Sequence, residues 1–139
     1  MTEFESSIRQ IPHKQTSVFT TLSDLNNVGK LQGRLPKDQF EDLQFNSDNV
    51  SINVQPVGKV TMRIAERDEP KCIKYETVDS FVPFNLWVQL LPVTETSCKM
   101  KLTIQAELNM FIKGIISKPL QDALEKLADA LSMIPYEDD

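Results

Sequence analysis

The chain has little of what metal centres, nucleotide sites and membrane spans require. Its single histidine, His13, and its two separated cysteines cannot supply a common metal-ligand set, so no metal is expected. The four glycines form no phosphate-binding loop, and no cofactor is expected. No run of about 18 uninterrupted apolar residues occurs, so no membrane span is expected.

Basic residues are also outnumbered. Lys and Arg together number 15 against 20 Asp and Glu, which gives a formal net charge of -5 and disfavours nucleic acid as a partner. The first residues show no basic start and no apolar run, so we expect neither a secretion signal nor a transit peptide, and a cytoplasmic location. In that reducing compartment Cys72 and Cys98 are expected to be buried structural thiols.

What the chain does have suits one folded domain. It has 139 residues, of which 40% are hydrophobic, enough for a core. We expect a single domain over residues 1–139, in which the acidic segment 136–139 is a frayed tail. His13 follows Pro12 and is expected at the surface, and no catalytic residue is predicted, because no nucleophile motif accompanies this histidine.

The first part of the chain mixes strand and helix patterns. Phe4, Ser6 and Ile8 alternate with polar residues, which predicts a half-buried strand that ends before Pro12. A short helix with one apolar face follows, centred on residues 18–22. Residues 28–35 are expected to be a second short helical or irregular piece, and residues 36–46 a loop or partial strand.

From Val50 onward the alternation predicts a meander of antiparallel strands over residues 50–54, 60–66, 71–77, 84–91 and 98–108. Their register can be predicted by placing Glu66 opposite Lys71 across a turn at residues 67–70. That register pairs Ile64 with Ile73, Met62 with Tyr75 and Val60 with Thr77 on one face, and Arg63 with Lys74 on the other.

The chain closes with an apolar stripe at gaps of three and four from Ile112 to Ile134, which predicts a long helix that packs on the sheet. Pro119 predicts either a kink or a short helical turn followed by a fresh helix start. The whole order predicts an α+β protein: two short helices after the first strand, and a curved antiparallel sheet wrapped around a long C-terminal helix.

The opening segment carries a more specific likeness. It has a strand that ends near Pro12, a helix with the pair Val18 and Phe19, and then Ser23, Asp24 and Leu25. This segment, from Ile8 to Leu31, resembles the opening of the START-like superfamily, also called SRPBCC or polyketide cyclase/dehydrase and lipid transport, in its small bacterial-type single-domain members. The resemblance implies the helix-grip fold and a cavity between sheet and C-terminal helix.

The residues expected to point at the helix are mostly aliphatic. Tyr75 and Thr77 add hydroxyl groups to this wall, and Met62 and Met100 add deformable surface, which is typical of a small-molecule site; a filled core is the alternative. The predicted cavity lining is Met62, Ile64, Ile73, Tyr75, Thr77, Met100, Leu102 and Ile104 from the strands and Ile112, Ile115, Ile116, Leu120 and Leu124 from the helix.

The facing of one strand stays open. If Leu90 pairs with Met100, then Phe84, Leu86 and Val88 point inward, and this register is favoured by hydrophobicity. A shift of one residue would place Asn85, Trp87 and Gln89 in the cavity instead, as a stacking surface with two amides.

Three functions remain. The resemblance implies binding or transport of a small hydrophobic ligand, lipid or polyketide-like, which is the hypothesis we favour. The second is a cyclase or aromatase-type enzyme in the same cavity, where Tyr75 is the inward residue capable of acid–base chemistry. The third is a protein-interaction module with a filled core, a homodimer or another protein partner contacting an exposed patch around Phe81, Phe84 and Trp87.

Overall fold

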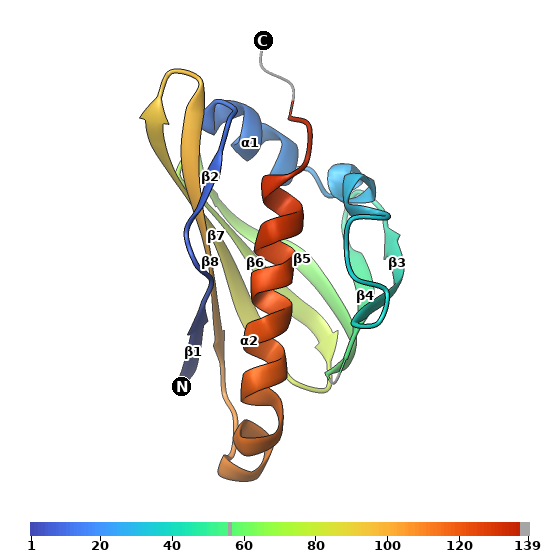
Figure 1. The fold of residues 1–139 in the computed structure, drawn as a ribbon. Helices are drawn as coiled ribbons and strands as arrows, with labels where there is room; N and C mark the ends of the chain where they lie inside the picture. The colour runs from blue at the N-terminus through green and yellow to red at the C-terminus, as the bar shows by residue number, and fades with distance from the viewer. Residues whose placement is uncertain (56, 137–139) are drawn as a thin grey trace.

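One strongly curved antiparallel sheet forms most of the molecule (Figure 1). The computed structural model describes residues 1–55 and 57–136. The sheet has the strand order β1-β8-β7-β6-β5-β4-β3, and β2 also pairs with β8. The strands are β1 (Thr2–Glu5), β2 (Arg9–Ile11), β3 (Phe40–Phe45), β4 (Val50–Val54), β5 (Gly58–Asp68), β6 (Cys72–Ser80), β7 (Phe84–Thr94) and β8 (Ser97–Ala106).

The helices lie on the concave side of this sheet. Helix α2 (Met110–Ser132) runs along it, while α1 (Gln15–Leu22) and the 3₁₀ helix η1 (Leu25–Leu31) lie between β2 and β3 in the chain. The predicted α+β helix-grip architecture, with two short helices before the meander, is therefore confirmed. Within the described residues no helix is both long and apolar enough to cross a membrane.

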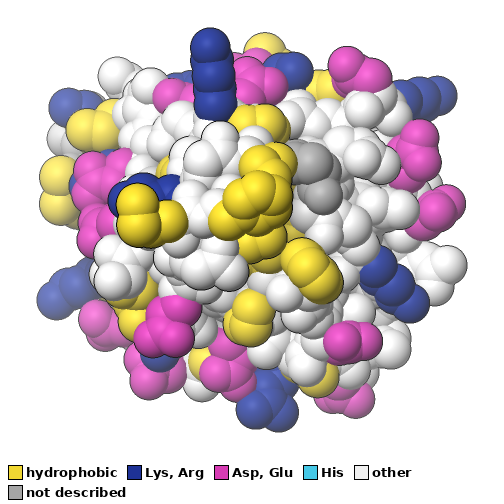
Figure 2. Space-filling view, turned by 90° about the horizontal axis from the view of Figure 1, so that it is seen from below, with side chains coloured by type: hydrophobic (Ala, Val, Ile, Leu, Met, Phe, Trp, Pro, Cys, Tyr) yellow, Lys and Arg dark blue, Asp and Glu magenta, His cyan; other side chains and the backbone are white. Residues whose placement is uncertain are grey.

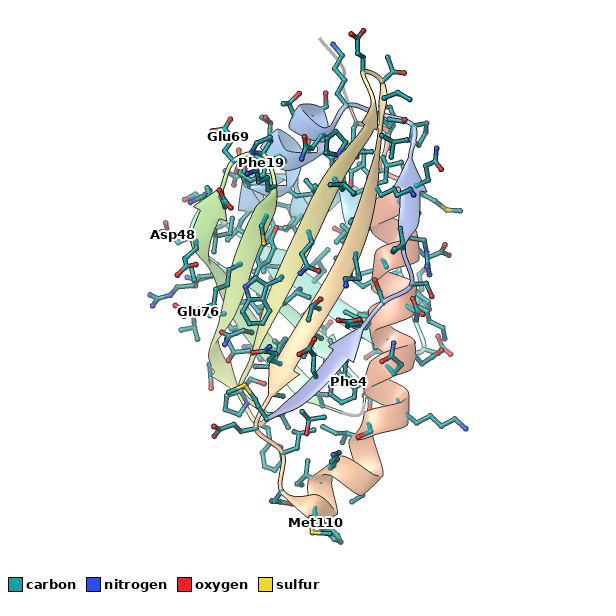
Figure 3. All side chains as sticks on the ribbon, turned by 90° about the vertical axis from the view of Figure 1, so that its left-hand side faces the viewer. Phe4, Phe19, Asp48, Glu69, Glu76 and Met110 are labelled. Atoms are coloured by element: carbon teal, nitrogen blue, oxygen red, sulfur yellow. The ribbon has the colours of Figure 1, made fainter. Side chains whose placement is uncertain are left out.

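Helix α2 forms because its start is capped and one of its faces is apolar. The side chain of Asn109 accepts a hydrogen bond from the backbone N–H of Ile112 at 2.8 Å, which satisfies one of the unpaired donors at the helix start. Pro119 lies inside the helix, which continues through it, so the predicted fresh helix start is wrong. The first turns lie at an angle to the rest (Figure 3), as a proline kink requires.

The predicted first strand is interrupted. Glu5 pairs with Thr103 and Arg9 with Met100, so the N-terminal segment holds one residue more than β8 between these two pairs. Ser6 occupies the break, where its backbone N–H and its hydroxyl both bond to the backbone of Leu102. The extra residue reverses the alternation, so Ile8 points outward. Ile8 is 63% exposed, and the prediction that it faces inward is wrong.

The predicted register between β5 and β6 is wrong by two positions in the middle of the strands and by three at Val60 and Glu66. Ile64 pairs with Tyr75 and Met62 with Thr77, because β5 continues to Asp68 and the register shifts at two irregular positions along it. Since a shift of two preserves the facing of a side chain, Met62 and Tyr75 still point inward. On the other face Arg63 lies opposite Glu76, not Lys74, and the two form an ion pair at 2.7 Å.

The open question about β7 is settled by its pairing. Leu90 pairs with Met100, so Leu86 and Val88 are buried and the reversed register is wrong. Trp87 lies on the outer face, half-buried, with the Lys74 ammonium 5.5 Å from its ring centroid. Gln89 accepts a hydrogen bond from the Thr103 hydroxyl on the same face.

The C-terminal end differs from the expected frayed tail. Tyr136 is buried, and its hydroxyl donates to the Leu131 carbonyl at 2.6 Å; residues 137–139 lie outside the described residues. His13 is half-buried, not fully at the surface, and its ring stands edge-on to that of Tyr136 at 5.6 Å. Cys98 is buried and Cys72 is half-buried, and neither forms a disulfide, so the burial prediction is confirmed only for Cys98.

A polar cluster fastens α2 to the N-terminal strands. The Glu125 carboxylate accepts hydrogen bonds from the backbone N–H and the hydroxyl of Ser7 at 2.8 and 2.7 Å, and pairs with Arg9 at 3.3 Å. Partial burial raises the pKa of the Glu125 carboxyl, but the Ser7 hydrogen bonds and the Arg9 charge outweigh it and leave this pKa below its ordinary value.

Replacing Glu125 with Gln should lower the free energy of unfolding by about 1 kcal/mol at neutral pH. The pKa of Glu125 is lower in the folded than in the unfolded protein. This contribution to stability is therefore complete above the unfolded-state pKa and is lost as the pH falls through the folded-state pKa. Denaturant unfolding at several pH values checks this. Asp122→Asn is the matched control, since Asp122 pairs with Lys126 one turn away on the same helix; an equal loss in both variants would contradict the prediction.

Candidate ligand-binding cavity

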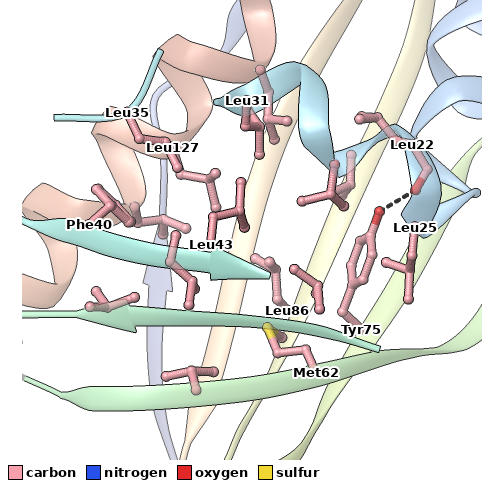
Figure 4. A pocket seen from close by; sticks show the side chains of 18 of the residues that line it. Leu22, Leu25, Leu31, Leu35, Phe40, Leu43, Met62, Tyr75, Leu86 and Leu127 are labelled. Atoms are coloured by element: carbon pink, nitrogen blue, oxygen red, sulfur yellow. Dashed lines mark hydrogen bonds between the residues drawn. The ribbon is translucent and has the colours of Figure 1, made fainter. Parts of the chain in front are cut away.

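A cavity of about 160 Å³ lies between the sheet and α2. Its floor comes from β4 to β8, one wall from the apolar stripe of α2, and its roof from η1 and β3 (Figure 4). The floor includes Val60, Met62, Leu86 and Ile104. These side chains meet because alternate residues of neighbouring strands share one face of the sheet.

The lining is almost entirely apolar. Among the lining residues, the ionisable side chains are those of Asp24 and Tyr75. The Tyr75 hydroxyl donates to the backbone carbonyl of Leu22 at 2.5 Å (Figure 4), so this proton is already bound. Burial raises the pKa of the Tyr75 phenol, and the lowering effect of Arg67 does not cancel it, so the hydroxyl stays neutral at physiological pH.

A second hollow lies beside the cavity at the edge of the sheet. It shares Leu31, Leu35, Phe40, Leu43 and Ile52 with the cavity, and it adds the polar residues Gln32, Lys37, Glu41 and Asp42. The β3 strand is irregular here, because its register shifts between Glu41 and Gln44 and Asp42 has a left-handed backbone with φ of 56°. We call this adjoining hollow the mouth; it is polar while the cavity is apolar.

The roof is fastened at both of its ends. At the start of η1 the Asp24 side chain accepts from the Asn26 N–H at 3.0 Å, next to the Tyr75–Leu22 hydrogen bond. Further along, the Phe45 ring lies so close to Gly29 that a Cβ there would be 2.8 Å from the ring. Gly29 thus allows β3 and η1 to approach, which holds the roof over the cavity.

The structure brings together part of the predicted cavity lining: Met62, Tyr75, Ile104, Leu120 and Leu124 line the cavity. Helix α1 packs on β6, β7 and β8 and fills one end of the sheet. The other predicted residues lie outside the lining. Most belong to the core or pack against it: Ile73, Met100, Leu102 and Ile116 are buried, and Ile64 and Ile112 are partly buried. Ile115 is 53% exposed, Thr77 accepts a hydrogen bond from the Phe84 N–H, and Asn85, Trp87 and Gln89 lie on the outer face of β7.

The roof residues are the part of the cavity that sequence reasoning missed. Leu22, Leu25, Val28 and Leu31 recur every three residues and all line the cavity. A spacing of three places side chains directly above one another in a 3₁₀ helix, so this period was the signal that could have identified the roof. Phe40 and Leu43 of β3 complete it, in a segment expected only as a loop or partial strand.

Comparison with known proteins supports the fold. No known protein family profile and no curated protein sequence matches the chain. Solved structures do match. A point mutant of norcoclaurine synthase from Thalictrum flavum, in complex with a transition-state analogue, superposes with a TM-score of 0.73 at 16% identity over 94% of this chain and 91% of that one. A START superfamily protein from Mycobacterium smegmatis gives 0.70 at 12% identity over 94% of both chains.

A protein from Thermus thermophilus is similar to the same extent, with a TM-score of 0.70 at 19% identity over 94% of both chains. At such identities the likeness concerns the fold alone. The chain has a START/SRPBCC-like fold, and the resemblance of its opening segment is confirmed at that level.

Replacing Tyr75 with Phe should loosen the roof, because the Leu22 carbonyl loses its donor. We expect the free energy of unfolding to fall by about 1 kcal/mol and amide exchange to accelerate selectively in residues 22–31. Tyr136→Phe is the matched control, since it removes a buried hydroxyl that bonds to the Leu131 carbonyl of α2 and not to the roof. Unchanged exchange in residues 22–31, or the same acceleration in both variants, would contradict this role.

Proposed function

We propose that this protein binds or transports a small hydrophobic ligand in the cavity between the sheet and α2. The observation that carries the proposal is a lining in which the deep side chains are aliphatic or aromatic and the Tyr75 hydroxyl is already satisfied by the Leu22 carbonyl. Such a cavity excludes water and gains about 25 cal/mol for each Å² of apolar ligand surface that it buries.

The volume limits the ligand. An apolar cavity of about 150 Å³ stays dry and accommodates a benzene ring, so the 160 Å³ cavity fits one ring or a short alkyl chain. A longer molecule, lipid or polyketide-like, would extend through the mouth and place its outer end among Gln32, Lys37, Glu41 and Asp42. We therefore favour a ligand with an apolar body and a polar end.

The second candidate is a cyclase-type enzyme acting in the same cavity. It is favoured by the fold shared with norcoclaurine synthase, which has also been solved in complex with dopamine and hydroxybenzaldehyde. General acid–base catalysis requires a group within reach of the reacting proton. In this chain the Tyr75 hydroxyl donates to Leu22 and the Asp24 side chain caps η1, so both would first have to leave their partners.

Native mass spectrometry of the purified protein, with denaturing extraction of any bound molecule, tests the proposal. We expect an apolar molecule to remain bound through purification. If the protein is purified empty, an added single-ring or short-chain compound should stabilise it by about 2.7 kcal/mol at a hundredfold excess over its Kd. Ala123→Leu fills the cavity from α2 and should weaken this ligand at least about tenfold. Ala65→Leu, an exposed site on β5, is the control.

Bare protein together with no thermal shift across apolar compounds would overturn the binding proposal. An equal effect of Ala123→Leu and Ala65→Leu would place the ligand elsewhere. Conversion of a bound compound that is lost in Asp24→Asn or Tyr75→Phe, with binding retained, would favour the enzyme.

A further inference from the structure

Large apolar side chains project into solvent at one end of the molecule, away from the cavity. Met110 is 91% exposed, Phe81 80% and Phe111 76%, and Val78 and Ile115 are each more than half exposed. We call these five residues the apolar tip. Side chains of this size are not normally left in water together, so a cluster of them marks an interaction surface.

The topology explains why these side chains gather. Phe84 pairs with Ala106, so the β6–β7 connection that carries Phe81 and the start of α2, which carries Met110, lie at the same end of the sheet. Met110 lies at the extreme end of the molecule in Figure 3. Figure 2 views this end directly and shows apolar side chains gathered in the middle of the face, with charged groups around them.

The start of α2 has an unusual charge pattern. Negative side chains stabilise the start of a helix, because the unpaired N–H groups there carry partial positive charge. The first turn of α2 has no acidic residue, and the first charges along it are Lys113 and Lys118, both exposed. Phe111, Ile115 and Lys118 share one helix face at spacings of four and three. In a chain of net charge -5 this arrangement works against helix stability, as functional positions often do.

We propose that the apolar tip docks on an anionic lipid surface, with Met110 and Phe111 entering the boundary between headgroups and acyl chains and with Lys113 and Lys118 contacting lipid phosphates. A bilayer accepts separate projecting side chains, whereas a protein partner must offer a matching surface of about 800 Å². Positive charge beside the apolar groups complements anionic headgroups. Asp79 and Glu107 are exposed at the ends of β6 and β8, so Met110 and Phe111, at the start of α2, lead the contact.

Flotation of the full chain with vesicles tests this proposal. We expect stronger binding to vesicles containing phosphatidylglycerol than to phosphatidylcholine alone. Met110→Ser combined with Phe111→Ser should lower binding at least about tenfold, because both apolar anchors are lost. Lys113→Gln and Lys118→Gln should each lower binding to the anionic vesicles about fivefold, and high salt should act in the same direction.

Controls at the opposite end of the sheet separate docking from general stickiness. Leu91→Ser with Val93→Ser removes exposed apolar side chains from the β7–β8 hairpin, and Lys71→Gln with Lys99→Gln removes two exposed charges. Both should bind vesicles as the parent chain does. Circular dichroism and Tm report whether each variant folds.

Three outcomes would overturn the proposal. They are absence of binding to either vesicle, equal losses in tip and control variants, and a concentration-dependent dimer, seen by light scattering, that the tip variant abolishes. The last would assign the tip to a second copy of the chain. Because the cavity is not involved, failure here leaves the proposed ligand binding untouched, and Ala123→Leu should dock normally.

Discussion

The structure depends on the mismatch between one helix and a wide, curved sheet. A helix with its side chains is about 10–12 Å across and strands lie about 4.8 Å apart, so α2 can cover only a few strands of an eight-stranded sheet. Helix α1 covers the end formed by β6, β7 and β8, and η1 covers the side formed by β3 and β4. The cavity is the space that these three helices leave, and it stays open because Tyr75 and Phe45 hold the roof in place.

An apolar space of this size lowers the stability of the fold. A cavity in a protein core costs about 24 cal/mol per Å³, which for 160 Å³ is about 4 kcal/mol of packing not made. Folding therefore leaves a substantial part of this free energy to be recovered by any apolar group that enters. The fixed roof makes this recovery selective, because a group must match a space whose walls are already held by hydrogen bonds and close ring contacts.

Much of this architecture could be read from the sequence, because alternation over β4, β7 and β8 and the stripe of α2 each reflect one buried face. The predictions of facing and register failed where one strand has an extra residue relative to its partner. The extra residue at Ser6 reversed the facing of Ile8. The β5–β6 hairpin closes at Asp68 and Cys72, which moved the register by three, and the irregularities in β5 each changed it by one. Of the cavity, the floor residues Met62, Tyr75 and Ile104 were predictable, whereas the partner of the Tyr75 hydroxyl was not, because Leu22 is brought to it only by the folded chain.

The irregularity of β3 has a consequence for the sheet as a whole. β3 is an edge strand, and a straight edge exposes unpaired backbone groups on which the strand of another molecule can align. The left-handed backbone at Asp42 bends this edge, and Glu41 and Asp42 place negative charge along it. A copy approaching in the same orientation meets like charge and a backbone that it cannot follow. The distortion beside the mouth thereby also disfavours edge-to-edge aggregation.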